Sequence, residues 1–118
     1  MHYLKKFESF NETSFQEVTP DWFNGIEYEE CEEFSEQELD KLREFLNNFT
    51  YSKAHIFKVY IDIIDFIKVG YGLHIVKTKD EWFGVRYYRN KSGFVKNLKC
   101  DQLNGVFDCI NYLKDLKN

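Results

Sequence analysis

Aromatic rings alternate with arginines along residues 82–89, whose sequence is WFGVRYYR. Successive side chains of a strand point to opposite sides. One side therefore carries two rings and a guanidinium, with Gly84 leaving a gap between them: Trp82, Arg86 and Tyr88. The other side is expected to lie in the core beneath the helices: Phe83, Val85 and Tyr87.

Flat rings beside fixed positive charges can stack on a base and neutralise a phosphate. Lys58 and Tyr60 from the first predicted strand, and Lys96 or Lys99 from the last, can join the same face. The pattern predicts a site for a nucleotide-like or other anionic ligand. Two alternatives remain: the rings and arginines only stabilise an exposed sheet face, or the N-terminal arm buries them.

Acidic residues crowd into the first half of the chain. Residues 1–50 hold thirteen Asp and Glu against four Lys and Arg, whereas residues 51–118 hold seven against twelve. The densest run contains Glu27, Glu29, Glu30, Glu32 and Glu33, and it continues into the helix that follows. Such a run is either a solvated face or, over residues 27–44, a surface for a basic partner protein.

Catalytic and metal-binding motifs are not found in the sequence. It has no glycine-rich phosphate loop, no Gly-x-Ser-x-Gly, no His-Glu-x-x-His and no Cys-x-x-Cys. The three cysteines, Cys31, Cys100 and Cys109, are predicted to be reduced thiols. We therefore predict a protein without enzymatic activity, cofactor or metal.

The predicted fold is α+β, a single domain over residues 1–118 in which two helices and an N-terminal arm (residues 1–25) pack on an antiparallel sheet of about four strands. Ser35 and Glu38 form a capping box that predicts a helix over 36–48. Period-two alternation predicts one strand over 55–63. Short turns separate further strands at 73–77, 81–89 and 94–100. Trp22 and Phe23 are expected to anchor the arm.

The last helix is expected to begin after Asp101 as its N-cap. It has two apolar stripes, and the second one comprises Gly105, Cys109, Tyr112 and Leu116. A helix that is apolar on two sides is usually covered on both. We expect the N-terminal arm or a second subunit to cover this stripe.

No apolar run approaches the ~20 residues of a membrane span, and the first seven residues contain no long apolar run that would predict a signal segment. The expected location is cytoplasmic, without membrane contact.

Three segments carry a resemblance to small accessory proteins of tailed bacteriophages: KKFESFNE at 5–12, DEWF at 80–83 and KCDQLNG at 99–105. The opening segment is also similar to capsid-targeting peptides of phage internal proteins. The resemblance implies a phage protein in an infected bacterial cell that counters a host defence by binding. Its target is a nucleotide-like ligand or, alternatively, a basic nucleic-acid-binding host protein. A minor virion protein is a third possibility.

Overall fold

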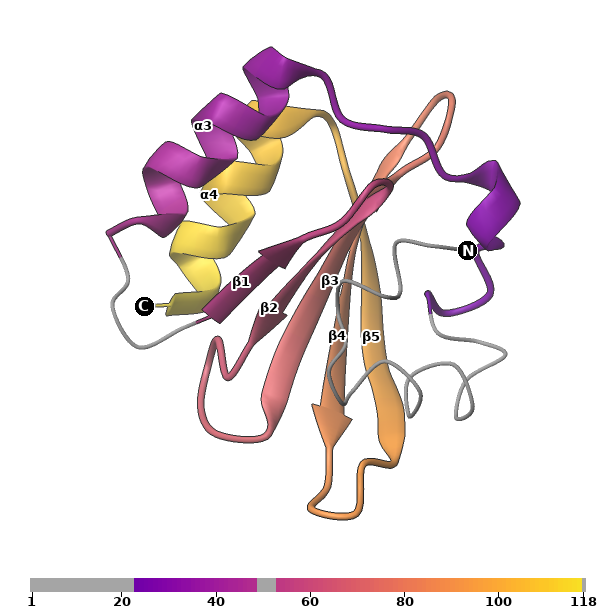
Figure 1. The fold of residues 1–118 in the computed structure, drawn as a ribbon, viewed down its shortest axis with the longest axis vertical. Helices are drawn as coiled ribbons and strands as arrows, with labels where there is room; N and C mark the ends of the chain where they lie inside the picture. The colour runs from indigo at the N-terminus through magenta and orange to yellow at the C-terminus, as the bar shows by residue number, and fades with distance from the viewer. Residues whose placement is uncertain (1–22, 49–52, 118) are drawn as a thin grey trace.

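The computed structural model describes residues 23–48 and 53–117. Five antiparallel strands form one sheet in chain order, each paired with its neighbours along the sequence (Figure 1). Their bounds are β1 Lys53–Ile56, β2 Tyr60–Ile64, β3 Tyr71–Lys77, β4 Trp82–Arg89 and β5 Val95–Leu103. Consecutive pairing follows from the short turns, which allow only antiparallel neighbours.

Two helices lie side by side over one face of the sheet, α3 Glu36–Leu46 and α4 Val106–Lys117. A short 3-10 turn, η1 Tyr28–Glu30, precedes them. The helices cover β1, β2 and the end of the sheet near the β3–β4 turn, whereas the far ends of β3, β4 and β5 extend beyond them (Figure 1). The α+β fold predicted from the sequence is confirmed, with five strands in place of about four.

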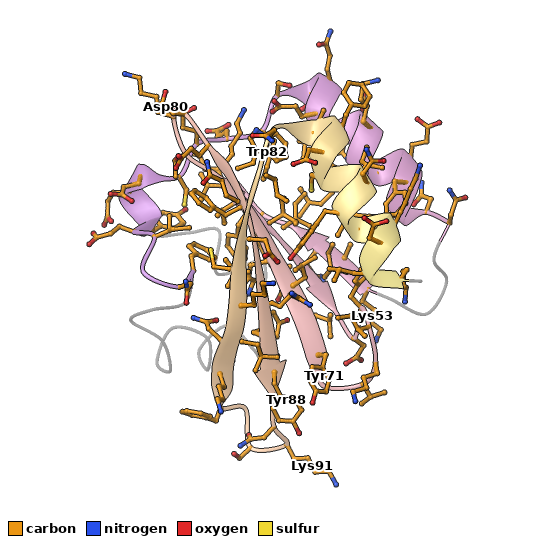
Figure 2. The ribbon with its side chains drawn as sticks, turned by 180° about the vertical axis from the view of Figure 1, so that it is seen from behind. Lys53, Tyr71, Asp80, Trp82, Tyr88 and Lys91 are labelled. Atoms are coloured by element: carbon orange, nitrogen blue, oxygen red, sulfur yellow. The ribbon has the colours of Figure 1, made fainter. Side chains whose placement is uncertain are left out.

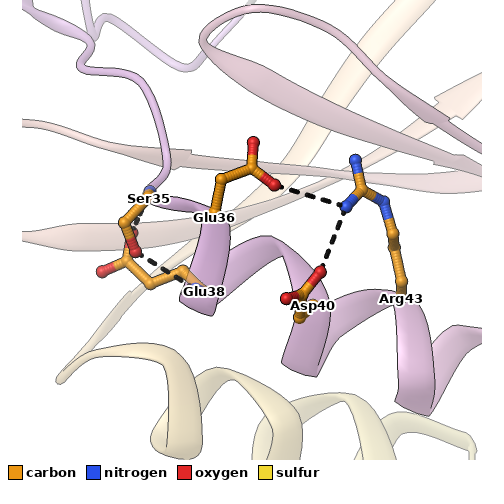
Figure 3. Close-up of polar contacts among 5 residues, drawn as sticks. All are labelled: Ser35, Glu36, Glu38, Asp40 and Arg43. Carbon is orange, nitrogen blue, oxygen red and sulfur yellow. Dashed lines mark hydrogen bonds and ion pairs between the residues drawn. The ribbon is translucent and has the colours of Figure 1, made fainter.

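The capping box predicted for α3 is present (Figure 3). The Ser35 hydroxyl accepts the Glu38 N–H at 3.1 Å, and the Glu38 carboxylate accepts the Ser35 N–H at 2.8 Å. Leu42 and Leu46 then bury one face of the helix. On its exposed side, Arg43 lies 3.4 Å from Asp40. An ion pair in solvent contributes little to the free energy of unfolding.

The main core lies between the helices and the sheet. It contains Leu42 and Leu46 of α3, Ile61 and Ile63 of β2, and Cys109 and Leu113 of α4, together with other buried residues. Apolar side chains at helical spacing and at strand spacing meet there. Burying them supplies most of the driving force for folding.

A second apolar cluster covers the opposite face of the sheet. Phe23 is 2% exposed and packs on Tyr60, with ring centroids 5.1 Å apart. Phe57, Val59 and Val76 belong to the same cluster. Phe23 thus anchors the chain as predicted. Trp22 and the rest of the arm, residues 1–22, lie outside the described residues.

The single strand predicted over 55–63 is wrong, because the chain turns back between β1 and β2. The Phe57 N–H donates to the Tyr60 carbonyl at 2.8 Å, and Ile56 pairs with Ile61. No Gly, Pro or Asn marks this turn. Phe57 and Val59 are instead buried against the sheet. The turn therefore shows the same alternation of apolar and polar residues as a strand.

The predicted start of the last helix is also wrong. Strand β5 continues through Asp101 to Leu103, and α4 begins at Val106. Gly105 precedes the helix with φ +112°, a conformation that favours glycine. Asp108 accepts the Asn104 N–H at 2.7 Å near this helix start.

Much of the second stripe of this helix packs on the protein's own core. Cys109 is fully buried, and Tyr112 and Leu116 pack against the same core beneath the helices. A Cβ at Gly84 would lie 2.5 Å from the Tyr112 ring. The sheet and α3 therefore cover the side that was expected to need a partner.

Within residues 23–48 and 53–117, no helix is long and apolar enough to cross a membrane. All three cysteines are free. Burial raises the pKa of Cys31 to about 11 and that of Cys109 to about 12, and burial also raises the pKa of Cys100. The reactive form of cysteine is the thiolate, so these thiols are poor nucleophiles at neutral pH.

Replacing Ser35 with Ala removes one half of the capping box and should lower the free energy of unfolding by about 1 kcal/mol. Ser35→Asp is the matched control, because its carboxylate can accept the same N–H and should retain most of the stability. Urea denaturation at constant slope measures both. Equal midpoints for Ser35→Ala and the wild type would show that the hydrogen bond contributes nothing.

Candidate functional site

The orientation predicted for β4 is wrong. Trp82, Gly84 and Arg86 face the helices, whereas Phe83 and Tyr87 belong to the cluster on the opposite face. Trp82 is 8% exposed and packs on Phe34, with ring centroids 5.4 Å apart. Alternation along the strand was correct, but its two sides were interchanged. Trp82 is therefore a core residue and offers no open ring to a ligand.

Lys58 and Tyr60 do not join the other predicted site residues. Tyr60 is fully buried on the opposite face, stacked on Phe57 with centroids 4.7 Å apart. Lys58 lies in the β1–β2 turn, 3.7 Å from Glu33. The missed β1–β2 turn displaces Lys58. Tyr60 faces away from the helices as predicted, but Arg86 and Tyr88 face the helices, so the two sets lie on opposite faces.

Four predicted residues do share one surface, on the helix side of the sheet: Arg86, Tyr88, Lys96 and Lys99. Arg86 pairs with Lys99 across β4 and β5, and Tyr88 pairs with Lys96. These pairs lie where the strands extend beyond the helices. Figure 2 shows Tyr88 at this end, beside Tyr71 and far from Asp80 and Trp82. We name this surface the open sheet end.

Tyr71, which sequence analysis did not select, supplies the second ring of the open sheet end. It pairs with Tyr88 across β3 and β4, with centroids 4.9 Å apart and ring planes at 52°. The Lys68 ammonium lies 4.7 Å from the Tyr71 ring centroid, a favourable cation–π contact. Only the register between β3 and β4 places Tyr71 opposite Tyr88.

Asp101 organises the cations of the open sheet end. Its carboxylate lies 3.5 Å from the Arg86 guanidinium and 3.5 Å from the Lys99 ammonium. It also accepts the Tyr112 hydroxyl at 2.9 Å. Burial, followed by this hydrogen bond, raises the pKa of Tyr112. The carboxylate thus ties α4 to the two basic side chains and limits their positions.

A hollow of about 320 Å³ opens beside these residues. Its basic lining comes from Lys68, Arg86 and Lys99, and its apolar lining includes Ile67 and Leu98. Ile67 and Leu98 are 42% and 47% exposed, so this apolar lining is accessible to a ligand. Cations, a ring and exposed aliphatic groups therefore meet in one concave place.

A buried polar cluster lies on the opposite face. The Tyr87 hydroxyl donates to Asp62 at 2.6 Å, and His74 stacks on Tyr87 with centroids 4.5 Å apart. The His74 Nε2 lies 3.6 Å, and the Arg89 guanidinium 4.0 Å, from the Asp62 carboxylate. Neither Asp62 nor His74 has any exposed surface. Nothing in the sequence pattern identifies either residue as buried, because the burial depends on side chains from other strands.

Burial dominates the titration of this cluster. It raises the pKa of Asp62 to about 6, although the Tyr87 hydrogen bond and Arg89 act in the other direction. Burial, with the nearby Arg89, lowers the pKa of His74 to about 3. The imidazole is therefore neutral at pH 7 and forms no ion pair with Asp62. The cluster is therefore a buried hydrogen-bonded network around a neutral histidine.

The acidic segment lies beside the β3–β4 turn, at the other end of the sheet from Tyr71 and Tyr88. The Glu32 N–H donates to the Lys77 carbonyl at 2.8 Å, which places the segment there. All five glutamates of the run are exposed.

Within the described ranges, His, Cys, Asp and Glu side chains form no group of three that could hold a metal ion.

No family model matches the chain, and no curated protein or solved structure matches it either.

Replacing Asp62 with Asn should change stability in a pH-dependent way. A raised folded-state pKa means that Asp62 favours folding most below about pH 4, and that this contribution is lost as the pH rises through about 6. The stability of Asp62→Asn relative to wild type should therefore improve by roughly 3 kcal/mol between pH 4 and pH 7.

The His74 contribution is present in both proteins and cancels in that difference. Exposed Asp80 gives the matched control, Asp80→Asn, whose charge pays no burial penalty. Thermal or urea unfolding at each pH measures the differences. A constant offset for Asp62→Asn across the range would contradict the raised pKa.

Proposed function

We propose that this chain is a non-enzymatic binding protein that takes up a nucleotide-like anionic ligand at the open sheet end. The hollow lined by Lys68, Arg86 and Lys99 carries this proposal. Small-molecule sites are concave and combine apolar walls with a few placed polar groups, and the hollow has both. The Tyr71 ring lines it, and Tyr88, at 36% exposure, packs on Tyr71.

The cations at this end are suited to phosphate. Arginine presents a planar fork of donors that matches phosphate oxygens, and lysine adds a mobile point charge. Asp101 holds Arg86 and Lys99 in place before any ligand arrives. A preformed site loses less conformational entropy on binding. The arrangement therefore supports binding.

The resemblance to tailed-bacteriophage accessory proteins supports a biological setting for such an activity. In that setting, the protein would sequester a ligand on which a host defence depends.

A second candidate uses the acidic segment against a basic, nucleic-acid-binding host protein. One observation favours it: Glu27, Glu29, Glu30, Glu32 and Glu33 are all exposed, on a turn held by its own hydrogen bonds. Charge complementarity of this kind mainly speeds association. The two candidates use opposite ends of the sheet, so single variants can separate them.

Calorimetric titration with a panel of nucleoside mono-, di-, tri- and cyclic phosphates tests the first candidate. Tyr71→Ala removes the ring that lines the hollow and should weaken binding of the active ligand about tenfold or more, since stacking on a ring is worth roughly 1–3 kcal/mol. Lys99→Ala should weaken it as well, and added salt should weaken binding to the wild type. Circular dichroism must first show that each variant is folded.

Lys79→Ala is the matched control, because Lys79 is equally exposed but lies next to Asp80 at the opposite end. It should bind like the wild type. Reversing Glu29, Glu30, Glu32 and Glu33 to Lys should also leave nucleotide binding intact. Failure of every nucleotide to bind, with capture of a host protein lost only in the charge-reversal variant, would replace the first candidate with the second.

A further inference from the structure

The charges around the hollow do not cancel. Three cations line it, Lys68, Arg86 and Lys99, and one carboxylate, Asp101, is shared between Arg86 and Lys99. Lys68 lies on the Tyr71 ring. The hollow and its immediate contacts therefore keep an excess of two positive charges.

Arg86 retains hydrogen-bonding capacity toward a ligand. Its contact with Asp101 is made through one terminal nitrogen at 3.5 Å, and a guanidinium has five N–H donors. Its side chain is 25% exposed. A phosphate that enters the hollow can therefore accept hydrogen bonds from the remaining N–H groups of Arg86 while Asp101 still contacts the guanidinium.

The size of the hollow limits what it can hold. Its volume of about 320 Å³ is at the lower end of the range for small-molecule sites, roughly 300–1,000 Å³. One base with its sugar and a single phosphate is of this order, whereas two linked nucleotides exceed it. Ile67, Leu98 and the Tyr71 ring provide the apolar contact that a base requires.

We propose that the ligand of the open sheet end is a phosphomonoester carried on a single nucleoside. This inference rests on the proposed function, because it names the ligand class of the same site. A phosphomonoester has a charge of about −1.5 to −2 at pH 7, which matches the excess of two positive charges. A phosphodiester leaves one of these charges uncompensated, and a triphosphate brings more negative charge than the hollow neutralises.

Two sources can supply this chemistry, a free nucleoside monophosphate and the 5′-phosphorylated end of a nucleic-acid strand. Both present one terminal phosphate next to one base. The remainder of a strand would lie outside the hollow, so the same contacts serve both.

Titration of the full-length chain with four sets of probes tests the proposal. The sets are the four ribonucleoside 5′-monophosphates and the matching nucleosides, 3′,5′-cyclic monophosphates and triphosphates. At least one monophosphate should bind ten times or more tightly than its nucleoside and its cyclic form, and more tightly than its triphosphate. Its affinity should also rise from pH 5 to pH 7, because the phosphate loses its second proton near pH 6.

Lys99→Met should lower monophosphate affinity at least fivefold and leave the nucleoside affinity unchanged. Lys79→Met, the matched control, should change neither. Oligothymidylates with and without a 5′-phosphate then separate the two sources. Tighter binding of the phosphorylated strand than of any monophosphate assigns the site to strand ends, and the reverse assigns it to free nucleotides.

A cyclic nucleotide or a triphosphate that binds more tightly than every monophosphate would overturn this inference and leave the proposed function standing. Equal binding of phosphorylated and unphosphorylated strands, with no binding of monophosphates, would overturn it as well. If no probe in any set binds, both the inference and the proposed function fail.

Discussion

The hydrogen bond between the Tyr87 hydroxyl and the buried Asp62 carboxylate, 2.6 Å long, determines which way β4 faces. A polar group buried without a partner is costly, so Tyr87 must point to the side on which Asp62 lies. Gly72 makes room for it, because a Cβ there would lie 2.2 Å from the Tyr87 ring. Strand alternation then sends Trp82, Arg86 and Tyr88 to the helix side.

The helices divide that side into a covered part and an open part. Near the β3–β4 turn, Trp82 lies under the helices in the main core. At the other end of the same strand neither α3 nor α4 covers Tyr88, which is 36% exposed (Figure 2). Asp101 lies between the two regions and contacts both Tyr112 of α4 and Arg86 of β4. Core packing thus positions the cations at the boundary of the open sheet end.

Sequence analysis succeeded where one local pattern decides the structure. Ser35 and Glu38, three residues apart, mark the start of α3 in the sequence, although the Glu38 carboxylate also accepts a hydrogen bond from Lys77 of β3. The prediction failed where the orientation of a strand depends on which residues of other strands are buried. Alternation in β4 is equally compatible with either side facing the helices, and only the burial of Asp62 and His74 decides between them. The β1–β2 turn was missed because Phe57 and Val59 are apolar and owe their conformation to packing on the second face. Residues that share one strand, such as Arg86 and Tyr88, were therefore predicted together correctly. The place of Tyr71 opposite Tyr88, and the separation of Tyr60 from both, follow only from how neighbouring strands pair and which way each strand faces.

A net charge of −4 does not oppose anion binding at the open sheet end, because the charges are separated in space. The acidic segment is attached to Lys77 at the far end of β3, and Tyr71 begins that strand. Seven residues at ~3.3 Å each separate the two ends by roughly 20 Å. The Debye length at physiological ionic strength is about 8 Å, so the glutamates are largely screened from a ligand beside Tyr71. The local excess of Lys68, Arg86 and Lys99 over Asp101 therefore sets the field that such a ligand meets.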